Sequence, residues 1–260
     1  MSASSTPTVP VAVVTGASSG IGRGAAVQLA RRGTGVVITY NRNPDGARQV
    51  VDEITELGGV AVALPLDIVR PESFPAFRDQ VSEALSERWH TDRLTALVNN
   101  AGVGGVPLMF SDTTEKQFDA FMQVNLRGPY FLTQSLLPLL ADGGAVVNVT
   151  SNATGAGLTP GYSAYAISKG GMATLTRYLA KELSPRGIRV NAVSPGVTRT
   201  RLGDDAFAKH PEMIPAIAEQ TALGRIGEPE DVGLMIAALA SEEGRWVTAQ
   251  EIEVSGGYNF

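Results

Sequence analysis

Tyr165 and Lys169 have the side chains from which a proton-transfer site can be built. They lie four residues apart in a helical pattern that begins near Ser163, so both fall on one face of a helix, one turn apart. A free tyrosine has a pKa of about 10, and a neighbouring ammonium group lowers it by favouring the phenolate. The pair predicts a tyrosine that gives a proton to a carbonyl oxygen or takes one from an alcohol. Tyr-x-x-x-Lys is also frequent by chance in helices, so it counts only beside other signals.

Ser151 and Asn125 are two further candidates for the same chemistry. Ser151 follows the valine-rich run at 146–150, and a hydroxyl at a strand end can hydrogen-bond a substrate oxygen as charge develops on it. Thr150 is the alternative at that strand end. Asn125 interrupts a strongly helical run at 118–137, where asparagine is a poor helix former.

A glycine-rich turn near the N-terminus predicts a phosphate site. The run Val11–Thr15 leads directly into Gly16-Ala17-Ser18-Ser19-Gly20-Ile21-Gly22, after which a helical pattern begins. Glycine lets the backbone approach a pyrophosphate, and the start of the helix presents free N–H groups to it. The alternative is an ordinary glycine-rich turn, but the position between a first strand and a helix is the context that a dinucleotide site requires. The candidate contacts are Gly16, Ser18, Ser19, Gly20, Ile21 and Gly22.

The end of the second apolar run favours NADP(H) over NAD(H). It reads Tyr40-Asn41-Arg42, and no carboxylate follows until Asp45. An NAD site places an acidic residue here for the ribose hydroxyls, whereas an NADP site places a cation for the 2′-phosphate. Arg42 could instead be a solvated loop residue. Asp67 and Ile68 end the third run and complete this candidate set, although Asp67 could equally cap a helix.

These residues are positioned by short apolar runs that alternate with helical patterns. Valine-rich runs that are apolar on both faces are typical of buried parallel strands, and the alternation predicts a doubly wound α/β sheet. The predicted strands are 11–15, 36–40, 60–66, 94–98, 145–150, 189–193 and 250–254. The predicted helices are 20–32, 44–57, 72–89, 112–140, 163–184 and 229–240. The irregular stretch at 197–227 is expected to be a substrate-binding loop.

Composition excludes several other classes. Of the 260 residues, 43% are hydrophobic and 18% are charged, which is not the composition of a disordered chain. The net charge of −5 argues against nucleic acid as a partner, and the absence of cysteine excludes thiolate metal sites and a cysteine nucleophile. We expect a frayed tail at 1–8, one catalytic domain at 9–260, no metal, no membrane segment and a cytoplasmic location.

Taken together, the motifs resemble the short-chain dehydrogenase/reductase family. The resemblance extends from Val11 to the end of the sequence and rests on six signals in the right order. They are the glycine turn, Asn99-Asn100-Ala101-Gly102, Asn125, a serine at the end of the fifth strand, Tyr165-x-x-x-Lys169 and Pro195-Gly196. It implies a Rossmann-type seven-stranded sheet with helices on both faces, a nicotinamide cofactor, hydride transfer between an alcohol and a carbonyl, and a homotetramer.

The resemblance also implies residue roles. Lys169 would bind the nicotinamide ribose, Asn125 would disrupt its helix and position a water beside the lysine, and Pro195, Gly196, Thr198 and Thr200 would hold the nicotinamide carboxamide. Asn99, Ala101 and Gly102 would stabilise the sheet and contact the cofactor. Ser151 lies fourteen residues before Tyr165, whereas the family spacing of thirteen would select Asn152. The strand end favours Ser151, with one extra residue in the loop that follows it.

The sequence therefore predicts an NADP-dependent oxidoreductase acting on a ketone, an aldehyde or a secondary alcohol. The substrate would contact Ser151, Ala153, Leu158, Tyr162 and Tyr165. The alternatives are a 3-oxoacyl thioester reductase of the same family, a non-catalytic NADP-binding sensor, and an epimerase or dehydratase of the extended sugar-nucleotide branch. Intact Tyr165, Lys169, Ser151 and Asn125 argue against the sensor, and the extended branch usually has longer chains.

Overall fold

A single parallel sheet runs through the protein. The computed structural model describes residues 9–259, apart from the side chains of residues 203 and 204, so the tail expected at 1–8 lies outside the described residues. Seven strands pair in the order β3-β2-β1-β4-β5-β6-β7, and every neighbouring pair is parallel. Their bounds are β1 Val11–Val14, β2 Gly35–Tyr40, β3 Ala61–Pro65, β4 Leu94–Asn99, β5 Leu140–Val149, β6 Arg189–Pro195 and β7 Glu251–Val254.

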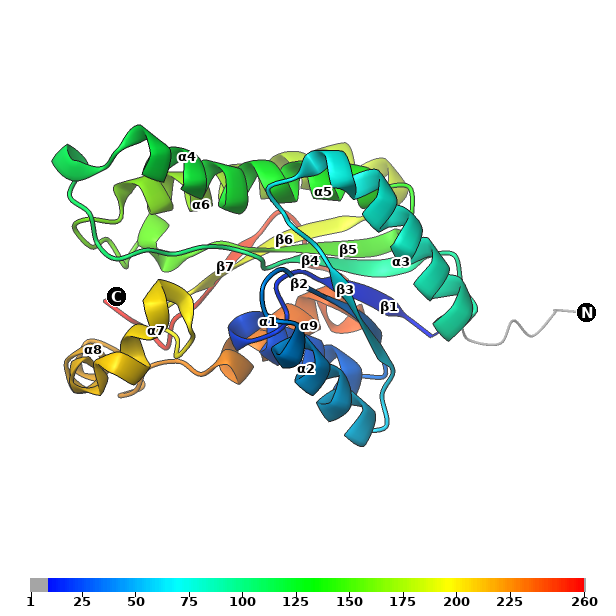
Figure 1. The fold of residues 1–260 in the computed structure, drawn as a ribbon, viewed down its shortest axis with the longest axis horizontal. Coiled ribbons are helices and arrows are strands. Elements are labelled where there is room, and N and C mark those ends of the chain that lie inside the picture. Colours follow the sequence, from blue (N-terminus) through cyan, green and yellow to red (C-terminus); the bar gives the residue numbers. More distant parts are fainter. Residues whose placement is uncertain (1–8, 260) are drawn as a thin grey trace, which may run out of the picture.

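Helices cover both faces of this sheet (Figure 1). One layer contains α3 (Phe74–Trp89), α4 (Glu115–Met122), α5 (Gly128–Leu136) and α6 (Ser163–Glu182), and the other contains α1 (Gly20–Arg31), α2 (Pro44–Glu56) and α9 (Pro229–Ala240). The doubly wound α/β class predicted from the sequence is confirmed. None of the helices in residues 9–259 has the length and apolarity needed to cross a bilayer.

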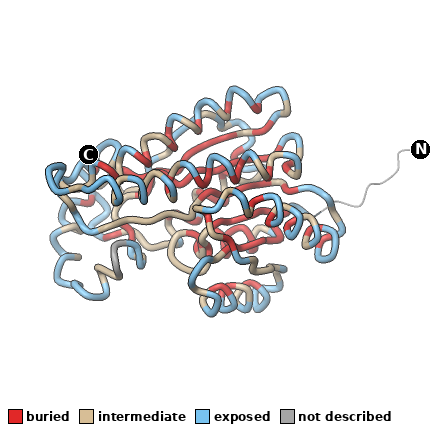
Figure 2. Tube along the Cα trace, turned by 45° about the horizontal axis from the view of Figure 1, so that its top comes forward, coloured by how far each residue is buried: buried red, intermediate tan, exposed pale blue. Residues whose placement is uncertain are grey.

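The central strands are buried because both of their faces meet a helix layer. Val11 and Val13 belong to the apolar cluster on one face, whereas Ala12 and Val14 belong to the cluster on the other. This is the period of two that a pleated strand imposes. Figure 2 shows the resulting buried centre beneath exposed outer helix faces. The rigid sheet fixes the strand ends from which the candidate site residues project.

Contact between α1 and α9 fixes the start of α1. A Cβ atom on Gly24 would lie 2.5 Å from the main-chain oxygen of Pro229, and one on Gly233 would lie 2.5 Å from the carbonyl carbon of Gly24. These distances leave no space for a side chain, so the two helices approach through their backbones. The first turn of α1, next to the glycine-rich turn, is thereby held in one position.

Two regions differ from the predicted elements. The helix expected at 112–140 is divided into α4 and α5 by a π-helical turn, η3 (Gln123–Arg127). The stretch expected to be irregular at 197–227 contains two short helices, α7 (Leu202–Lys209) and α8 (Ile214–Glu219). In Figure 1 these helices lie beyond the carboxyl ends of the strands, the end at which ligands bind in such sheets.

Candidate active site

Ser151, Tyr165 and Lys169 come together at the carboxyl end of β5. Ser151 follows that strand by two residues, and the other two lie on α6, which packs beside β5 and β6. Ser151 lies close enough to the Tyr165 phenol for its hydroxyl to lower the pKa of that phenol. Lys169 is buried, and its Nζ atom donates a hydrogen bond to the main-chain oxygen of Val149 at 2.8 Å. The three candidate residues therefore lie at the same end of the sheet.

The pKa of Tyr165 shifts in the opposite direction from the one predicted. Burial raises it, the hydrogen bond from Ser151 lowers it by less, and Tyr162 raises it further. Burial also lowers the pKa of Lys169 from 10.5 to about 8, so this lysine holds its proton weakly. In the protein alone, Tyr165 is therefore a neutral phenol at neutral pH, the form that can donate a proton.

The structure distinguishes Ser151 from its two sequence neighbours. The Thr150 hydroxyl donates to the main-chain oxygen of Val193 at 3.0 Å, so it is used within the sheet. Asn152 begins a short 3-10 turn, and its buried Nδ2 atom has no hydrogen-bond partner. Of the three, only Ser151 acts on the pKa of Tyr165, which favours the assignment based on the strand end over the family spacing.

Asn125 lies in the π-helical turn and is tied to the loop after β4. Its Oδ1 atom accepts from the Val103 amide at 2.9 Å, and its Nδ2 atom donates to the Val103 oxygen at 3.0 Å and to the Ser168 hydroxyl at 3.1 Å. A Cβ atom on Gly102 would lie 3.1 Å from Asn125 Oδ1 and 3.4 Å from Lys169 Nζ. The asparagine amide and the lysine thus approach the same glycine. π-Helical turns often occur at functional sites because they redirect one side chain.

Aromatic rings form a wall beside Tyr165. Phe121 meets Tyr165 edge to face with ring centroids 6.1 Å apart, and Tyr162 does so at 6.3 Å. Tyr162 was predicted from the sequence, but Phe121 was not. It lies four residues before Asn125, on the same helical face, and this spacing could have identified it. Of the other predicted substrate contacts, Ala153 is half-buried and Leu158 is largely exposed.

The glycine-rich turn fits a dinucleotide phosphate. Gly16 and Gly20 have φ angles of +63° and +56°, which favour glycine, and a Cβ atom on Gly22 would lie 2.4 Å from Asn100 Nδ2. Ser19 caps α1 without a side-chain hydrogen bond, so the first amides of the helix, from Gly20 and Ile21 onward, are available to an anion. The crowded backbone and open helix start are what close approach of a pyrophosphate requires.

The Asn99-Asn100-Ala101-Gly102 segment links this turn to the sheet. The Thr15 hydroxyl accepts hydrogen bonds from the amides of Asn100 and Ala101, both at 2.9 Å. The buried Asn99 side chain donates to Thr133 Oγ1 and Asn148 Oδ1, also at 2.9 Å. These bonds join β1, β4, β5 and α5. The segment therefore ties the glycine-rich turn to the centre of the sheet.

The end of β2 presents an arginine to solvent. Arg42 is exposed, and within residues 9–259 it makes neither a hydrogen bond nor an ion pair. Asn41 donates to Asp67 Oδ1 at 3.4 Å, and Tyr40 is half-buried at the strand end. The Ile68 side chain packs in the core against Gly128, so a cofactor contact at this position would be through its backbone.

The segment after β6 crosses above the start of α1. Gly196 lies against Ser255, because a Cβ atom on it would be 2.6 Å from Ser255 Cα. The Thr198 hydroxyl donates to the Gly196 oxygen at 3.0 Å, so it is used within the loop. The Thr200 hydroxyl accepts from the Leu202 amide at 3.2 Å, and a Cβ atom on Gly20 would be 3.4 Å from Thr200 Cγ2. Pro195 and the residues after it thus lie where they could hold a nicotinamide above the phosphates.

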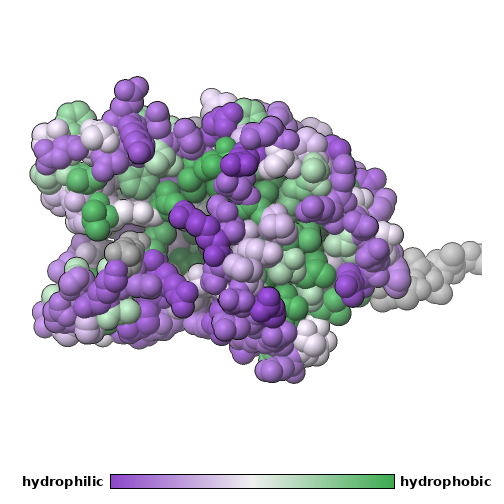
Figure 3. All heavy atoms as spheres, viewed as in Figure 1, coloured by the Kyte–Doolittle hydropathy of each residue, from purple (hydrophilic) through white to green (hydrophobic). Residues whose placement is uncertain are grey.

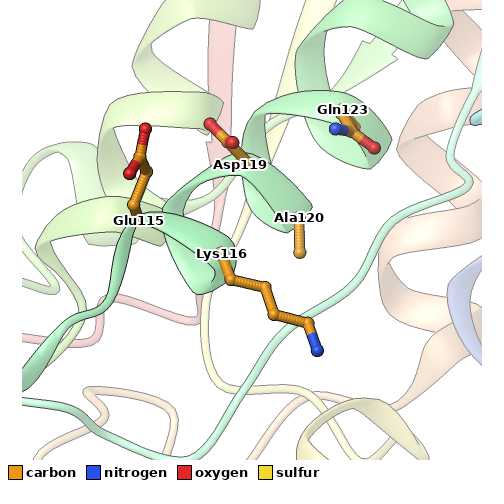
Figure 4. Close-up of a pocket in the computed structure, with 5 residues that line it drawn as sticks. All are labelled: Glu115, Lys116, Asp119, Ala120 and Gln123. Atoms are coloured by element: carbon orange, nitrogen blue, oxygen red, sulfur yellow. The ribbon is translucent and has the colours of Figure 1, made fainter.

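The surface is hollowed at the same end of the molecule. Figure 3 shows a recess between the α4–α6 layer and the α7–α8 lobe, with apolar side chains inside it. A pocket of about 290 Å³ lies at the starts of α1 and α2. A larger hollow of about 480 Å³ is formed by residues 115–123 of α4 and η3 alone, and Figure 4 shows its side chains fanning apart rather than converging. In residues 9–259, no three metal-ligating side chains cluster.

Comparison with known proteins identifies relatives over nearly the whole chain. The family model described as enoyl-(acyl carrier protein) reductase matches residues 16–259. An NADPH-dependent aldehyde reductase-like protein of Arabidopsis thaliana is 35% identical, with 95% of this chain and 93% of that protein covered. The 3-oxoacyl-[acyl-carrier-protein] reductase FabG of Staphylococcus epidermidis is 36% identical, with 95% and 97% covered.

A solved structure agrees with these matches. The landomycin C-6 ketoreductase LanV, with bound NADP and rabelomycin, superimposes with a TM-score of 0.87 at 32% identity and 97% coverage of both chains. These matches extend over nearly the full length of this chain and of the matched proteins. The chain belongs to the short-chain dehydrogenase/reductase family, as its sequence motifs indicated.

Proposed function

We propose that this short-chain dehydrogenase/reductase is an NADPH-dependent carbonyl reductase in which Tyr165 is the proton donor. The observation that carries the proposal is the buried Tyr165 phenol, which lies beside Ser151 and whose pKa burial raises. A tyrosine that stays protonated suits reduction, in which the substrate oxygen gains a proton. Oxidation would need the phenolate as the base, and burial disfavours that form.

Each residue has a separate task in this proposal. Ser151 donates a hydrogen bond to the carbonyl oxygen and stabilises the negative charge that develops there. The Tyr165 O–H bond breaks as its proton passes to that oxygen, and the Lys169 ammonium stabilises the resulting phenolate. Asn125 positions the loop beside Lys169 through its two bonds to Val103. A bound NADPH would supply the hydride to the carbonyl carbon.

The cofactor assignment rests on the turn, on Arg42 and on the relatives. Gly16, Gly20 and Gly22 provide a cradle for the pyrophosphate, and the exposed Arg42 suits a 2′-phosphate. The Arabidopsis relative is named as NADPH-dependent, and LanV holds NADP in its structure. These observations support NADP(H) as the cofactor. Because Ser151, Tyr165 and Lys169 are all present, they also favour an enzyme over a non-catalytic NADP-binding sensor, which needs no proton donor.

The substrate is best sought among neutral ketones and aldehydes. Phe121, Tyr162 and Tyr165 offer ring surfaces, and the candidate substrate contacts Ala153 and Leu158 are uncharged. A 3-oxoacyl thioester is the second candidate, because the relative from Staphylococcus epidermidis is a 3-oxoacyl-[acyl-carrier-protein] reductase. We expect the loop at 197–227 to cover whichever substrate binds.

A panel of carbonyl compounds tests this function. Loss of NADPH absorbance would be followed with aromatic ketones, aliphatic aldehydes and 3-oxoacyl thioesters, each with and without Tyr165→Phe. We expect at least one class to be reduced by the wild-type enzyme and by no variant lacking the phenol. Reduction of thioesters alone would favour the second candidate, and failure to reduce any class while NADPH binds would favour a sensor.

We also propose that the chain assembles as a homotetramer. Large apolar side chains are exposed on α5 and α6, including Tyr130, Ile167 and Tyr178, and Leu234 of α9 and Trp246, which follows α9 in the sequence, are exposed as well. Two separate apolar surfaces allow two different isologous contacts, which together close a tetramer. Light scattering should give a tetramer for the wild type and smaller species for Tyr178→Arg and Trp246→Arg, whereas a wild-type monomer would refute the assembly.

A further inference from the structure

The pocket at the starts of α1 and α2 includes one residue from a distant part of the chain. Its lining comes from the glycine-rich turn, from the β2–α2 turn and from Arg201, which directly precedes α7. The lining residues are Ser18, Ser19, Gly20, Arg23, Asn43, Asp45, Gly46, Gln49, Val50 and Arg201. A residue of the candidate substrate loop thus reaches the candidate cofactor groove.

The two arginines that line this pocket, Arg23 and Arg201, differ in the strength of their ion pairs with carboxylates. Arg23 makes two hydrogen bonds of 2.9 Å to Glu53 and one of 3.0 Å to Glu230, so its charge is already matched. The ion pair of Arg201 with Asp205 is 3.9 Å long, and the Arg201 side chain is 72% exposed. A long, exposed ion pair is weak. Arg201 can therefore turn its guanidinium toward an anion at small cost.

Asp45 is the acidic residue in the lining, and its charge opposes an anion. Its carboxylate pairs with Arg48 at 3.0 Å, and it is largely exposed. The nearby starts of α1 and α2 add partial positive charge to the pocket. Asn43 caps α2 by accepting from the Gly46 amide at 3.1 Å, so this turn is fixed. The pocket thus combines ordered backbone with a loosely held arginine.

Residues 200–202 lie between the start of α1 and the loop after β4, beside this pocket. Thr200 lies above Gly20 at the start of α1, since a Cβ atom on that glycine would be 3.4 Å from Thr200 Cγ2. Leu202 lies against the loop after β4, since a Cβ atom on Gly104 would be 2.8 Å from Leu202 Cγ. Arg201 is between these two contacts. A ligand that held Arg201 would fix the first residues of the substrate loop on both sides.

We propose that Arg201 is a second specificity-determining cation for the 2′-phosphate of NADPH, and that this contact fastens the substrate loop. The inference rests on the proposed function, which supplies the cofactor. The 2′-phosphate is the group concerned because the pocket includes the turn after β2, where the adenosine ribose binds, whereas the pyrophosphate lies at the start of α1 alone. Arg42 directly precedes the lining residue Asn43, so it would approach the phosphate from the end of β2, whereas Arg201 would approach it from the loop side.

Binding measurements on one matched pair of variants test the assignment. Dissociation constants of NADPH, NADH and 2′,5′-ADP would be measured by calorimetry for the wild type, Arg201→Ala and Arg199→Ala. Arg199 is the control because it lies on the same segment, pairs with Glu228 at 3.0 Å and does not line the pocket. We expect Arg201→Ala to weaken NADPH and 2′,5′-ADP about tenfold while NADH binding is unchanged. Arg199→Ala should leave all three unchanged.

The outcomes separate this inference from the proposed function. A wild-type protein that binds NADH as tightly as NADPH would contradict the cofactor assignment itself. If the wild type prefers NADPH, equal weakening of both cofactors by Arg201→Ala would place Arg201 at the pyrophosphate, and no weakening would remove it from the site. Either result overturns the inference.

Amide hydrogen exchange tests whether the contact between Arg201 and the 2′-phosphate holds the substrate loop in one position. We expect NADPH, but not NADH, to slow amide exchange across α7 in the wild type, and we expect this protection to be lost in Arg201→Ala at saturating NADPH. Protection by NADPH that persisted in Arg201→Ala would contradict the coupling between the phosphate and the loop.

Discussion

The Nζ atom of Lys169 donates a hydrogen bond to the main-chain oxygen of Val149, 2.8 Å away, at the end of β5. The lysine is buried in a place where a charged group is poorly solvated, and its pKa is lowered to about 8. Burial of the charged lysine therefore lowers the stability of the folded protein, although the lysine serves the active site. Such a cost is common where function needs a buried ionisable group.

Lys169→Met should stabilise the protein while abolishing turnover. The folded pKa lies below the unfolded value of 10.5, so at pH 7 the full cost of burying the charge is present, roughly 3 kcal/mol. Loss of the bond to Val149 offsets roughly 1 kcal/mol of the gain. We expect denaturant unfolding at pH 7 to show a net gain of about 2 kcal/mol. A destabilised variant would show that the lysine is well solvated.

The same pKa predicts how wild-type stability varies with pH. Between about pH 8 and 10.5 the unfolded lysine binds more protons than the folded one, so its contribution to the free energy of unfolding rises with pH in that window. The Lys169→Met variant should lack this rise. The difference in the free energy of unfolding between the two proteins, measured at pH 7 and at pH 10, separates the contribution of Lys169 from those of the other titrating groups.

Carbonyl reduction should slow above about pH 8. Tyr165 keeps its proton there because its pKa is raised, but Lys169 becomes neutral and no longer stabilises the phenolate. The pH profile of kcat/KM should therefore fall on the alkaline side with an apparent pKa near 8. Lys169→Arg, which keeps its charge, should lose this inflection. An unchanged inflection in that variant would assign it to another group.

Much of the site could be predicted because its chemistry lies in short motifs. The four-residue spacing of Tyr165 and Lys169 requires only a helix, and the alternation of valine runs with helical patterns indicated the confirmed fold class. Ser151 was favoured because its strand ends there. These inferences depend on local periodicity, which the sequence contains directly.

The remaining features depend on tertiary contacts. The helical pattern predicts one element over 112–140 with Asn125 as a poor helix former inside it, and the π-helical turn that divides this element accompanies that residue's bonds to Val103, 22 residues away in the sequence. The direction of the Tyr165 pKa shift depends on burial, which the motif does not reveal. Phe121 has no polar group, so only its four-residue spacing from Asn125 marks it in the sequence.

Arg42→Ala should shift cofactor preference. The side chain is exposed and unpaired, so its removal leaves the fold intact and removes one charged contact to the 2′-phosphate. We expect NADPH binding to weaken at least about tenfold, with NADH binding nearly unchanged. Calorimetry on both cofactors measures this, with Arg31→Ala, in the exposed last turn of α1, as the control. Equal losses for NADPH and NADH would remove the 2′-phosphate role.

Ser151→Ala should lower turnover about 10²–10³-fold, as expected for the loss of a donor to a developing oxyanion. Asn152→Ala should cost far less, because Asn152 Nδ2 makes no hydrogen bond and Ser151 remains next to Tyr165. Thr150→Ala should act on stability through its lost bond to Val193. Steady-state kcat of the three variants shows which residue donates the hydrogen bond to the substrate oxygen. A larger loss for Asn152→Ala than for Ser151→Ala would assign this role to Asn152 instead.

The most direct test of the account is the turnover of Tyr165→Phe alongside its NADPH affinity. This change removes one hydroxyl and keeps the ring that packs against Phe121 and Tyr162. We predict that kcat for carbonyl reduction falls at least about 100-fold, the scale of general acid catalysis, while the dissociation constant of NADPH is unchanged. Near-normal turnover with intact cofactor binding would contradict the central claim that Tyr165 donates the proton.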